Sequence, residues 1–271
     1  LRYDKMTAME LFQESGVSTE LIEGFLRPIL LVGLFKPPEE LSAALVMDML
    51  YYYAIGHQYD FDVKWARSPI SEAIIRPMVQ DIQNNAQFAG LQASIEGNTY
   101  VTEIIVDDSR KASSVKIQRQ GKDSSELIQA DAVVLAVGVT GLKKIIQQSP
   151  SLANISPDLR RAAGSMKAID VIATRIWFDK KVNCPFPSNV FSEYSELEGA
   201  GGTFFCLDTL HDNPWGEEDN ANNKGTVVAA DFYNACNLMY LSDEEIKRRL
   251  VEVMLPSAVP SFKDAKVIDM W

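Results

Sequence analysis

The sequence predicts an α/β (α+β) fold that contains one parallel-sheet strand and a separate, mostly antiparallel sheet. The first observation is the run Ala132–Val137, which is entirely apolar and is bounded by Asp131 and Gly138. Such a run is typical of a strand buried on both faces of a parallel sheet. The second observation is a series of strand-like segments in the C-terminal part of the chain, at 168–178, 203–208, 226–233 and 266–271. Successive strands of this kind favour an antiparallel sheet.

The N-terminal part is expected to be helical. Apolar residues recur at helical spacing over 6–26, with Gly16 between two short helices, and a markedly apolar helix covers 41–55. The apolar stretch at 29–35 is far shorter than the roughly 20 residues of a membrane span. The helix at 41–55 is expected to be a core element. The alternative is that its Met and Tyr side chains line a site for an apolar ligand.

The middle of the chain alternates between helices and strands. A short strand is expected at 60–65, a helix from Ser68 to about Asn84, and two strands at 99–106 and 114–119. The apolar strand at 130–137 then passes through Gly138 into a helix, and further helices are expected at 156–165 and 243–254. Crevices between a strand and the following helix are where doubly wound folds bind nucleotides.

Composition narrows the range of partners and compartments. The chain of 271 residues is 46% hydrophobic, which is enough for a substantial core. Its 26 basic and 37 acidic residues give a net charge of −11 without a basic patch, which argues against nucleic-acid binding. Its three cysteines are odd in number and widely spaced, which argues against a disulfide framework and a zinc site and favours a reducing compartment.

Both ends of the chain lead us to expect an internal piece of a longer protein. The first residue is Leu1, and no signal-peptide pattern follows it. The last segment, 266–271, reads as a strand without a turn or polar tail after it.

Common catalytic constellations are weak in this sequence. His57 follows an apolar helix and is interpreted as structural, and His211 lies in a loop between two acids without enough nearby ligands for a metal. No Gly-x-Ser-x-Gly elbow occurs, and the glycines at 199–202 precede a strand, whereas a phosphate loop follows one. Hydrolase, metal-dependent and P-loop functions are therefore disfavoured.

Several stretches together carry a resemblance to a known family. They are Lys36-Pro37-Pro38-Glu39-Glu40-Leu41-Ser42, the Pro69 to Asp81 helix, the Val101 to Asp107 strand, Ala130 to Gly138, and Ile176-Trp177-Phe178-Asp179-Lys180. In this order they resemble the central part of the flavin-dependent phytoene desaturase and amine oxidase superfamily, over nearly the whole chain. The Pro-Pro-Glu-Glu-Leu-Ser and Ile-Trp-Phe-Asp-Lys stretches are similar to carotene-desaturase-like oxidoreductases.

The resemblance implies a partial FAD-binding, Rossmann-like domain interleaved with a substrate domain of helices on a mostly antiparallel sheet. It implies substrate-domain helices at 1–67, part of the FAD-binding domain at 68–141, and the substrate-domain sheet at 142–271. Cofactor contacts are implied at Val101, Ala136, Val137 and Gly138, which should border one crevice within about two strand spacings, ~10 Å. Candidates for the substrate wall are Met47, Tyr51, Tyr52 and Trp177.

The chain also departs from the family pattern. The Gly-x-Gly-x-x-Gly strand that holds the pyrophosphate is absent, so residues 1–271 alone are expected to bind FAD weakly or not at all. Position 138 is Gly where many family members have Pro.

The resemblance implies an FAD-dependent oxidoreductase that removes hydride from a hydrophobic substrate, with carotenoid-like polyenes among the candidates. This chemistry suits a chain with two histidines, because the flavin accepts the hydride and few acid or base side chains are needed. The alternatives are an amine oxidase acting on a polar amine, and a non-catalytic domain that binds an apolar ligand or a partner protein. We expect a cytoplasmic or plastid location and a peripheral membrane contact of the full-length protein, and the sequence leaves the oligomeric state open.

Overall fold

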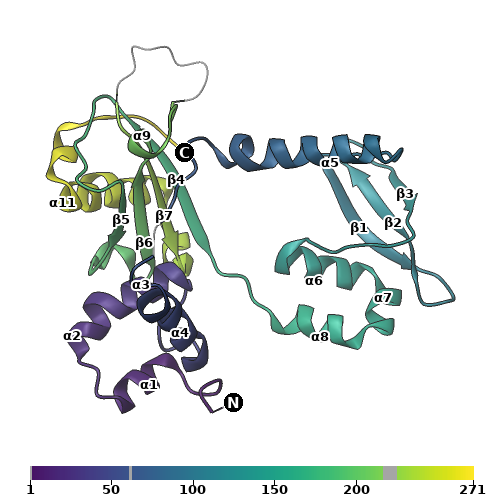
Figure 1. Cartoon of the computed structure of the whole chain (residues 1–271), viewed down its shortest axis with the longest axis horizontal. Coiled ribbons are helices and arrows are strands. Elements are labelled where there is room, and N and C mark those ends of the chain that lie inside the picture. Colours follow the sequence, from purple (N-terminus) through teal and green to yellow (C-terminus); the bar gives the residue numbers. More distant parts are fainter. Residues whose placement is uncertain (1, 61–62, 216–224) are drawn as a thin grey trace. The chain divides into compact units, whose positions relative to one another are not determined.

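The computed structural model describes residues 2–60, 63–215 and 225–271 (Figure 1). The chain forms two compact units, Leu1–Pro77 with Ile169–Trp271, and Met78–Ala168. The α-helices and strands of the first unit are α1 (Ala8–Glu14), α2 (Thr19–Leu21), α3 (Arg27–Gly33), α4 (Ala43–Leu50), β4 (Val171–Phe178), β5 (Ser188–Phe191), β6 (Gly201–Cys206), α9 (Leu207–Leu210), β7 (Val227–Tyr233), α10 (Asp243–Arg248), α11 (Leu255–Ala258) and β8 (Val267–Met270). Those of the second unit are β1 (Thr99–Val106), β2 (Ala112–Arg119), β3 (Ser125–Gln129), α6 (Gly138–Gln148), α7 (Pro150–Ile155) and α8 (Pro157–Ser165), and α5 (Arg76–Phe88) runs from the first unit into the second.

Shorter helical turns extend these elements. π-helical turns lie at Ile22–Leu26, Tyr51–Gly56, Ser71–Ile75 and Arg249–Met254, and 3₁₀ turns at Ser195–Leu197, Ala235–Tyr240 and Pro260–Asp264. The helix predicted at 41–55 is therefore α4 with its π-helical turn, and Ser42 caps it by accepting a hydrogen bond from the Leu45 N–H. The helix predicted at 243–254 is likewise α10 with the following turn, capped by Ser242.

The sheet of the first unit has the strand order β5-β6-β7-β4-β8, and all neighbouring strands are antiparallel. This confirms the antiparallel sheet predicted from 168–178, 203–208, 226–233 and 266–271. Edge strand β5 was not predicted, because its four residues are too few to give a clear alternation of polar and apolar side chains.

One face of this sheet is the main hydrophobic core. Side chains alternate between the faces, so Ile176 and Phe178 of β4 lie on the same face as Val228 and Phe232 of β7 and are all almost completely buried. They belong to a cluster with residues of α10, α11 and the turns beside them. The opposite face carries the other residues of the same strands, among them Arg175.

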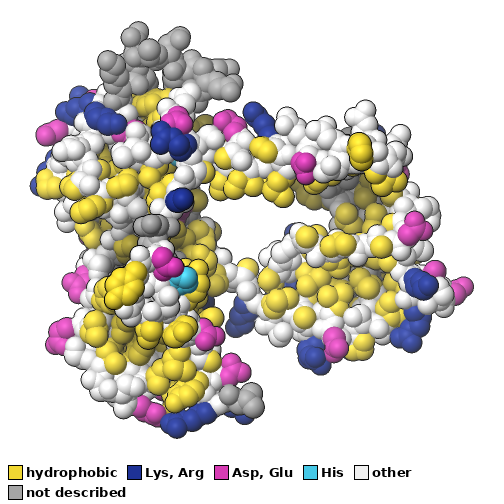
Figure 2. Space-filling view, in the orientation of Figure 1, with side chains coloured by type: hydrophobic (Ala, Val, Ile, Leu, Met, Phe, Trp, Pro, Cys, Tyr) yellow, Lys and Arg dark blue, Asp and Glu magenta, His cyan; other side chains and the backbone are white. Residues whose placement is uncertain are grey.

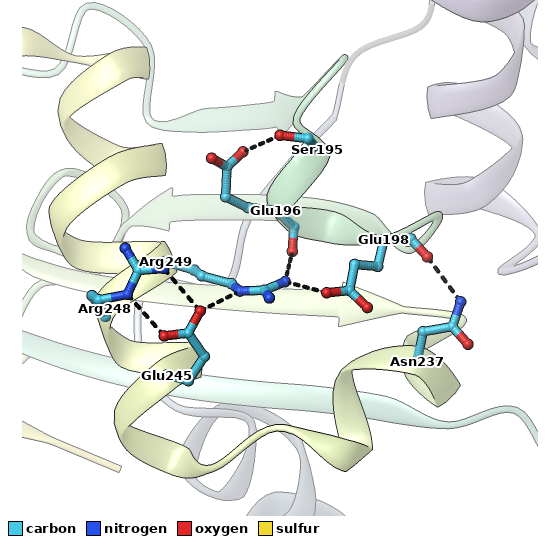
Figure 3. Close-up of polar contacts among 7 residues, drawn as sticks. All are labelled: Ser195, Glu196, Glu198, Asn237, Glu245, Arg248 and Arg249. Atoms are coloured by element: carbon cyan, nitrogen blue, oxygen red, sulfur yellow. Dashed lines mark hydrogen bonds and ion pairs between the residues drawn. The ribbon is translucent and has the colours of Figure 1, made fainter.

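An ion-pair network attaches α10 and its π-helical turn to the loop before β6 (Figure 3). Arg249 donates hydrogen bonds to the Glu196 carbonyl oxygen at 2.9 Å and to Glu198 Oε1 at 2.7 Å. Glu245 accepts from both Arg248 and Arg249 at 2.8 Å, and these two guanidinium groups lower the pKa of Glu245 to about 2. The network fixes the helices on the core face of the sheet.

The N-terminal helices form a second layer in the same unit. A capping box between Thr7 and Glu10 starts α1, and α1 and α4 pack around a core that includes Phe12 and Val46. Helix α3 packs on β6, and the contact is so close that a Cβ added to Gly201 would lie 2.7 Å from the Leu31 Cβ.

The second unit is a three-stranded antiparallel sheet, β1-β2-β3, with α6 and α7 packed on β1. The Ile104 N–H donates to the Ser149 Oγ at 2.9 Å, and both residues are buried. Strands β1 and β2 match the predictions for 99–106 and 114–119, whereas β3 was not predicted. The unit boundaries differ from those implied by the resemblance: 68–77 cluster with the first unit and 142–168 with the second, because α6 to α8 pack on β1 and on one another.

The prediction of a buried strand at 132–137 is wrong for this structure. The segment pairs with no strand among the described residues, and Val134 is 91% exposed. The ladder between β2 and β3 ends beside it, with a last bond from the Ala130 N–H to the Ser113 oxygen at 3.0 Å. A strand is buried on both faces only when neighbouring strands and covering layers are present. The run therefore adds to the exposed hydrophobic side chains of this unit, some of which are visible over α5 and α6 in Figure 2.

Two further expectations concern other segments. Of the strand expected at 60–65, residues 61–62 lie outside the described residues and the rest is not a strand. In the part of the chain that the structure describes, no helix is long and apolar enough to span a membrane.

Candidate active site

Three polar side chains lie together on the sheet face opposite the main core. Asp231 and Tyr233 alternate along β7, and Thr203 on β6 is directly opposite Asp231. The Tyr233 hydroxyl is 3.2 Å from the Thr203 Oγ1. Regular strand pairing therefore positions an acid, a phenol and a hydroxyl on one surface.

The environment of this group changes its acidity. Burial raises the pKa of Asp231, and this increase is opposed by the positive charge of Arg175 and by the Tyr233 hydroxyl. Burial also raises the pKa of Tyr233, so its phenol stays protonated at neutral pH. A half-buried carboxylate of this kind favours a cationic ligand, because a positive charge offsets the cost of its desolvation.

Aromatic side chains border the polar group. Phe35, from the end of α3, stacks on Tyr233 with ring centroids 4.8 Å apart and an interplanar angle of 25°. Trp65 meets Phe205 of β6 at 5.1 Å on the same sheet face. The face thus combines a carboxylate with aromatic rings, which is the combination that binds amines through charge and cation–π contacts.

The predicted substrate-lining residues occupy two elements of the first unit. Met47 is partly buried on α4, and Tyr51 and Tyr52 follow in its π-helical turn with 62% and 54% of their surface exposed. The interpretation of this turn as core is therefore wrong for the two tyrosines. Trp177 is partly buried on β4, two residues from Arg175 and so on the face that carries Asp231.

The predicted cofactor contacts lie in the second unit. Val101 is on β1 and is 39% exposed. Ala136, Val137 and Gly138 are exposed and lead into α6, which packs on β1. Gly138 has a φ of +64°, a conformation that suits glycine, and a Cβ there would meet nothing within 4 Å.

Two other ionisable groups, His57 and Asp208, have polar partners among the described residues. His57 Nδ1 lies 3.0 Å from Asp60 Oδ1. Asp208 forms an ion pair with Lys181 and lies 3.4 Å from the Thr226 Oγ1. In the described residues no group of three or more His, Cys, Asp or Glu side chains is arranged to hold a metal ion.

Comparison with known proteins identifies the family. The sequence model of the flavin-containing amine oxidoreductases matches residues 4–266. The chain belongs to this family. A comparison with curated protein sequences finds no match.

Solved structures show the same fold. Cyclohexylamine oxidase from Brevibacterium oxydans IH-35A aligns with the whole chain at a TM-score of 0.55 and 11% identity, and a putrescine oxidase variant with redesigned cofactor binding aligns at 0.58 and 12%. The chain covers 53% of each of these proteins, so it spans about half their length.

FAD is the cofactor that membership of this family implies, and the predicted contact residues fit one border of such a site. Residues Ala136–Gly138 carry no charge, and the N-terminus of α6 has no side-chain cap, so its backbone N–H groups are open to an acceptor. The Rossmann-like strand that should accompany them is not formed by the described residues.

The sequence interpretation missed Asp231, Tyr233, Thr203 and Arg175. A signal was present, because Asp231 and Tyr233 alternate within the apolar segment 226–233, where an acid is unusual. Thr203 and Arg175 could be found only through the register of the sheet, which is a tertiary property.

Proposed function

We propose that the full-length protein is an FAD-dependent oxidoreductase that oxidises an amine at the carbon next to its nitrogen. Family membership over residues 4–266 supports the flavin chemistry. The choice of an amine rests on Asp231, a half-buried carboxylate on the sheet face opposite the main core, whose pKa is raised by burial. A substrate ammonium group would supply the cation that this carboxylate favours.

The residues of the chain have distinct roles in this proposal. Asp231 accepts hydrogen bonds from the substrate nitrogen, and the rings of Phe35 and Tyr233 contact the adjoining carbons and exclude water. Val101 and the segment Ala136–Gly138 contact the flavin through backbone groups and apolar side chains. When bound, the flavin supplies the hydride acceptor.

A hydrophobic, polyene-like substrate is the second candidate. This candidate is supported by four large side chains that we propose as the lining for an apolar substrate: Met47, Tyr51, Tyr52 and Trp177. The amine is the better supported choice, because a polyene offers no partner to Asp231. The third candidate is a non-catalytic domain that binds an apolar ligand or a partner protein.

Flavin absorbance and anaerobic reduction separate these candidates. We expect the purified full-length protein to be yellow and its flavin to be bleached by one or more members of an amine panel, but not by polyenes. Bleaching by a polyene alone would favour the second candidate, and a colourless protein that takes up no FAD would favour the third.

The Asp231→Asn variant tests the residue that carries the proposal. We expect kcat/KM for the amine to fall at least tenfold, about 1.4 kcal/mol, with KM carrying most of the change. Glu252→Gln is the matched control, because it removes one exposed carboxylate from the same unit. Equal kcat/KM values for Asp231→Asn and the wild type would show that Asp231 does not bind the substrate.

Compartment and membrane contact remain parts of the proposal. The three cysteines are unpaired, which supports a reducing compartment, cytoplasmic or plastid. Exposed hydrophobic side chains support a peripheral membrane contact. Co-sedimentation of the full-length protein with lipid vesicles tests the contact, and recovery of all protein in the supernatant would argue against it.

A further inference from the structure

A second feature of the first unit is a cavity of about 500 Å³ between the segment 64–71 and the end of the sheet. The sheet side is formed by Arg175 of β4, Phe205 of β6 and the short helix α9. The other side is formed by Trp65, Ile70 and their neighbours. All of these residues belong to one compact unit, so the cavity does not depend on the second unit.

The segment 64–71 is fastened to the sheet side by several contacts. Arg67 forms an ion pair with Asp212, and its Nε lies 2.9 Å from the Asp212 Oδ1. The Asp212 N–H donates to the Arg67 carbonyl oxygen at 2.8 Å. The Trp65 and Phe205 rings lie 5.1 Å apart. These contacts connect the segment 64–71 to the sheet side at the edge of the cavity.

Of the two cationic side chains that line this cavity, Arg175 is partly buried and Lys64 is exposed. The Arg175 backbone is fixed, because Arg175 and Trp271 exchange both backbone hydrogen bonds at 2.9 Å. The Arg175 side chain is partly buried, and its guanidinium has no hydrogen bond or ion pair with any of the described residues. Asp231 is its diagonal neighbour in the β4–β7 pairing and forms no ion pair with it. A partly buried guanidinium favours a carboxylate or phosphate that accepts two parallel hydrogen bonds.

The rest of the lining sets the character of the ligand. The described lining contains Lys64 and Arg175 but no acid, although the whole chain has a net charge of −11. His211 adds no positive charge at neutral pH, because burial and the charge of Arg175 lower its pKa. The other lining residues are mainly apolar or aromatic. The lining of the cavity is therefore positively charged and mainly apolar, although the chain as a whole is acidic.

We propose that this cavity binds an apolar molecule that carries one carboxylate, with the carboxylate on Arg175. Trp65 and Phe205 contact an aromatic or alkyl group of the ligand, and Leu207 and Leu210 cover its far end. A carboxylate is favoured over a phosphate, because a single guanidinium neutralises one charge and the apolar walls disfavour a second. The proposal concerns binding alone and does not depend on the proposed amine oxidation.

Calorimetry on the full-length protein with 3-phenylpropionate tests the proposal without turnover. We expect the carboxylate to bind at least tenfold more tightly than 3-phenylpropionamide, which has the same shape without the charge. We also expect it to bind at least tenfold more tightly than acetate, which has the charge without the ring. Equal affinity for carboxylate and amide, or no heat of binding for the carboxylate at millimolar concentration, would overturn the proposal.

Variants identify the cavity as the place of binding. Arg175→Gln should weaken binding of 3-phenylpropionate at least tenfold, whereas Arg161→Gln should leave it unchanged, because Arg161 is an exposed arginine of the second unit. If Arg175→Gln does not fold, Arg175→Lys keeps the charge and should weaken binding by losing the paired hydrogen bonds. Unchanged affinity in the folded Arg175 variants would show that the ligand binds elsewhere.

Discussion

The close approach of α3 to β6 can be tested by adding one methyl group at Gly201. An ideal Cβ at this position would lie 2.7 Å from the Leu31 Cβ and 3.0 Å from the Leu31 carbonyl carbon. Ordinary carbon–carbon contacts are about 3.5–4.0 Å, so the helix and the strand must separate by about 1 Å. Neither atom is the end of a flexible side chain, and the strain cannot be relieved by a rotamer change.

The magnitude follows from two opposing terms. Overpacking a well-packed contact lowers the free energy of unfolding by about 1–3 kcal/mol. Replacing Gly by Ala raises it by about 0.4–1 kcal/mol, because Ala restricts the unfolded chain. From the midpoints of these ranges, about 2 and about 0.7 kcal/mol, Gly201→Ala should lower the free energy of unfolding by about 1.3 kcal/mol, measured by urea unfolding followed by circular dichroism. The control is Gly24→Ala in the same unit, where the new Cβ would meet only the Glu193 Oε1 at 3.4 Å. The reasoning is refuted if Gly201→Ala is as stable as the wild type, or if Gly24→Ala is destabilised equally.

Three further predictions test the fold. The pKa of Glu245 is lowered to about 2, so its stabilising effect is present above pH 4.5 and is lost as the pH falls toward 2. The stability difference between the wild type and Glu245→Gln, measured by urea unfolding, should therefore shrink over that range, and a constant difference would contradict the network of Figure 3. Ile176→Ala should cost about 2–5 kcal/mol in a thermal or urea melt, whereas Tyr51→Ala should cost under about 0.5 kcal/mol, because Ile176 is fully buried and Tyr51 is mostly exposed. Val134→Lys should change the stability of residues 1–271 by less than about 0.5 kcal/mol, and a loss of several kcal/mol would indicate a buried strand at 132–137.

Local patterns predicted the elements that depend on local sequence. The cap at Ser242 and the turn between β1 and β2 act within a few residues, and the structure contains both, whereas Ser156 makes no side-chain cap hydrogen bond at α8. Strands β4 and β7 of the antiparallel sheet were also predictable, because the alternation of buried and less buried residues along them follows a period of two. Strand β3 was missed, since all five of its residues are exposed and no apolar face marks it.

The failure at 132–137 has a different physical origin. Its composition fits a strand covered on both sides, and composition does not supply the neighbouring strands. In the described residues the run follows β3 without pairing to a strand, and most of its residues are exposed. The composition of an apolar run shows only that the run favours burial between neighbouring strands. Whether such strands are present depends on the tertiary structure.

The candidate site depends on the same distinction between local pattern and pairing. Asp231 and Arg175 are 56 positions apart in sequence, and they share a sheet face only because Arg175 is paired with Ala229. A shift of the β4–β7 register by one residue would move Arg175 to the core face, where an unpaired guanidinium costs far more than a single packing defect. The register that buries Ile176 and Phe178 therefore also places Arg175 and Asp231 together on the opposite face. The packing of the core fixes the polar chemistry on the opposite side of the sheet, so a substitution that slips this register should disrupt both the fold and the proposed binding of amines and carboxylates.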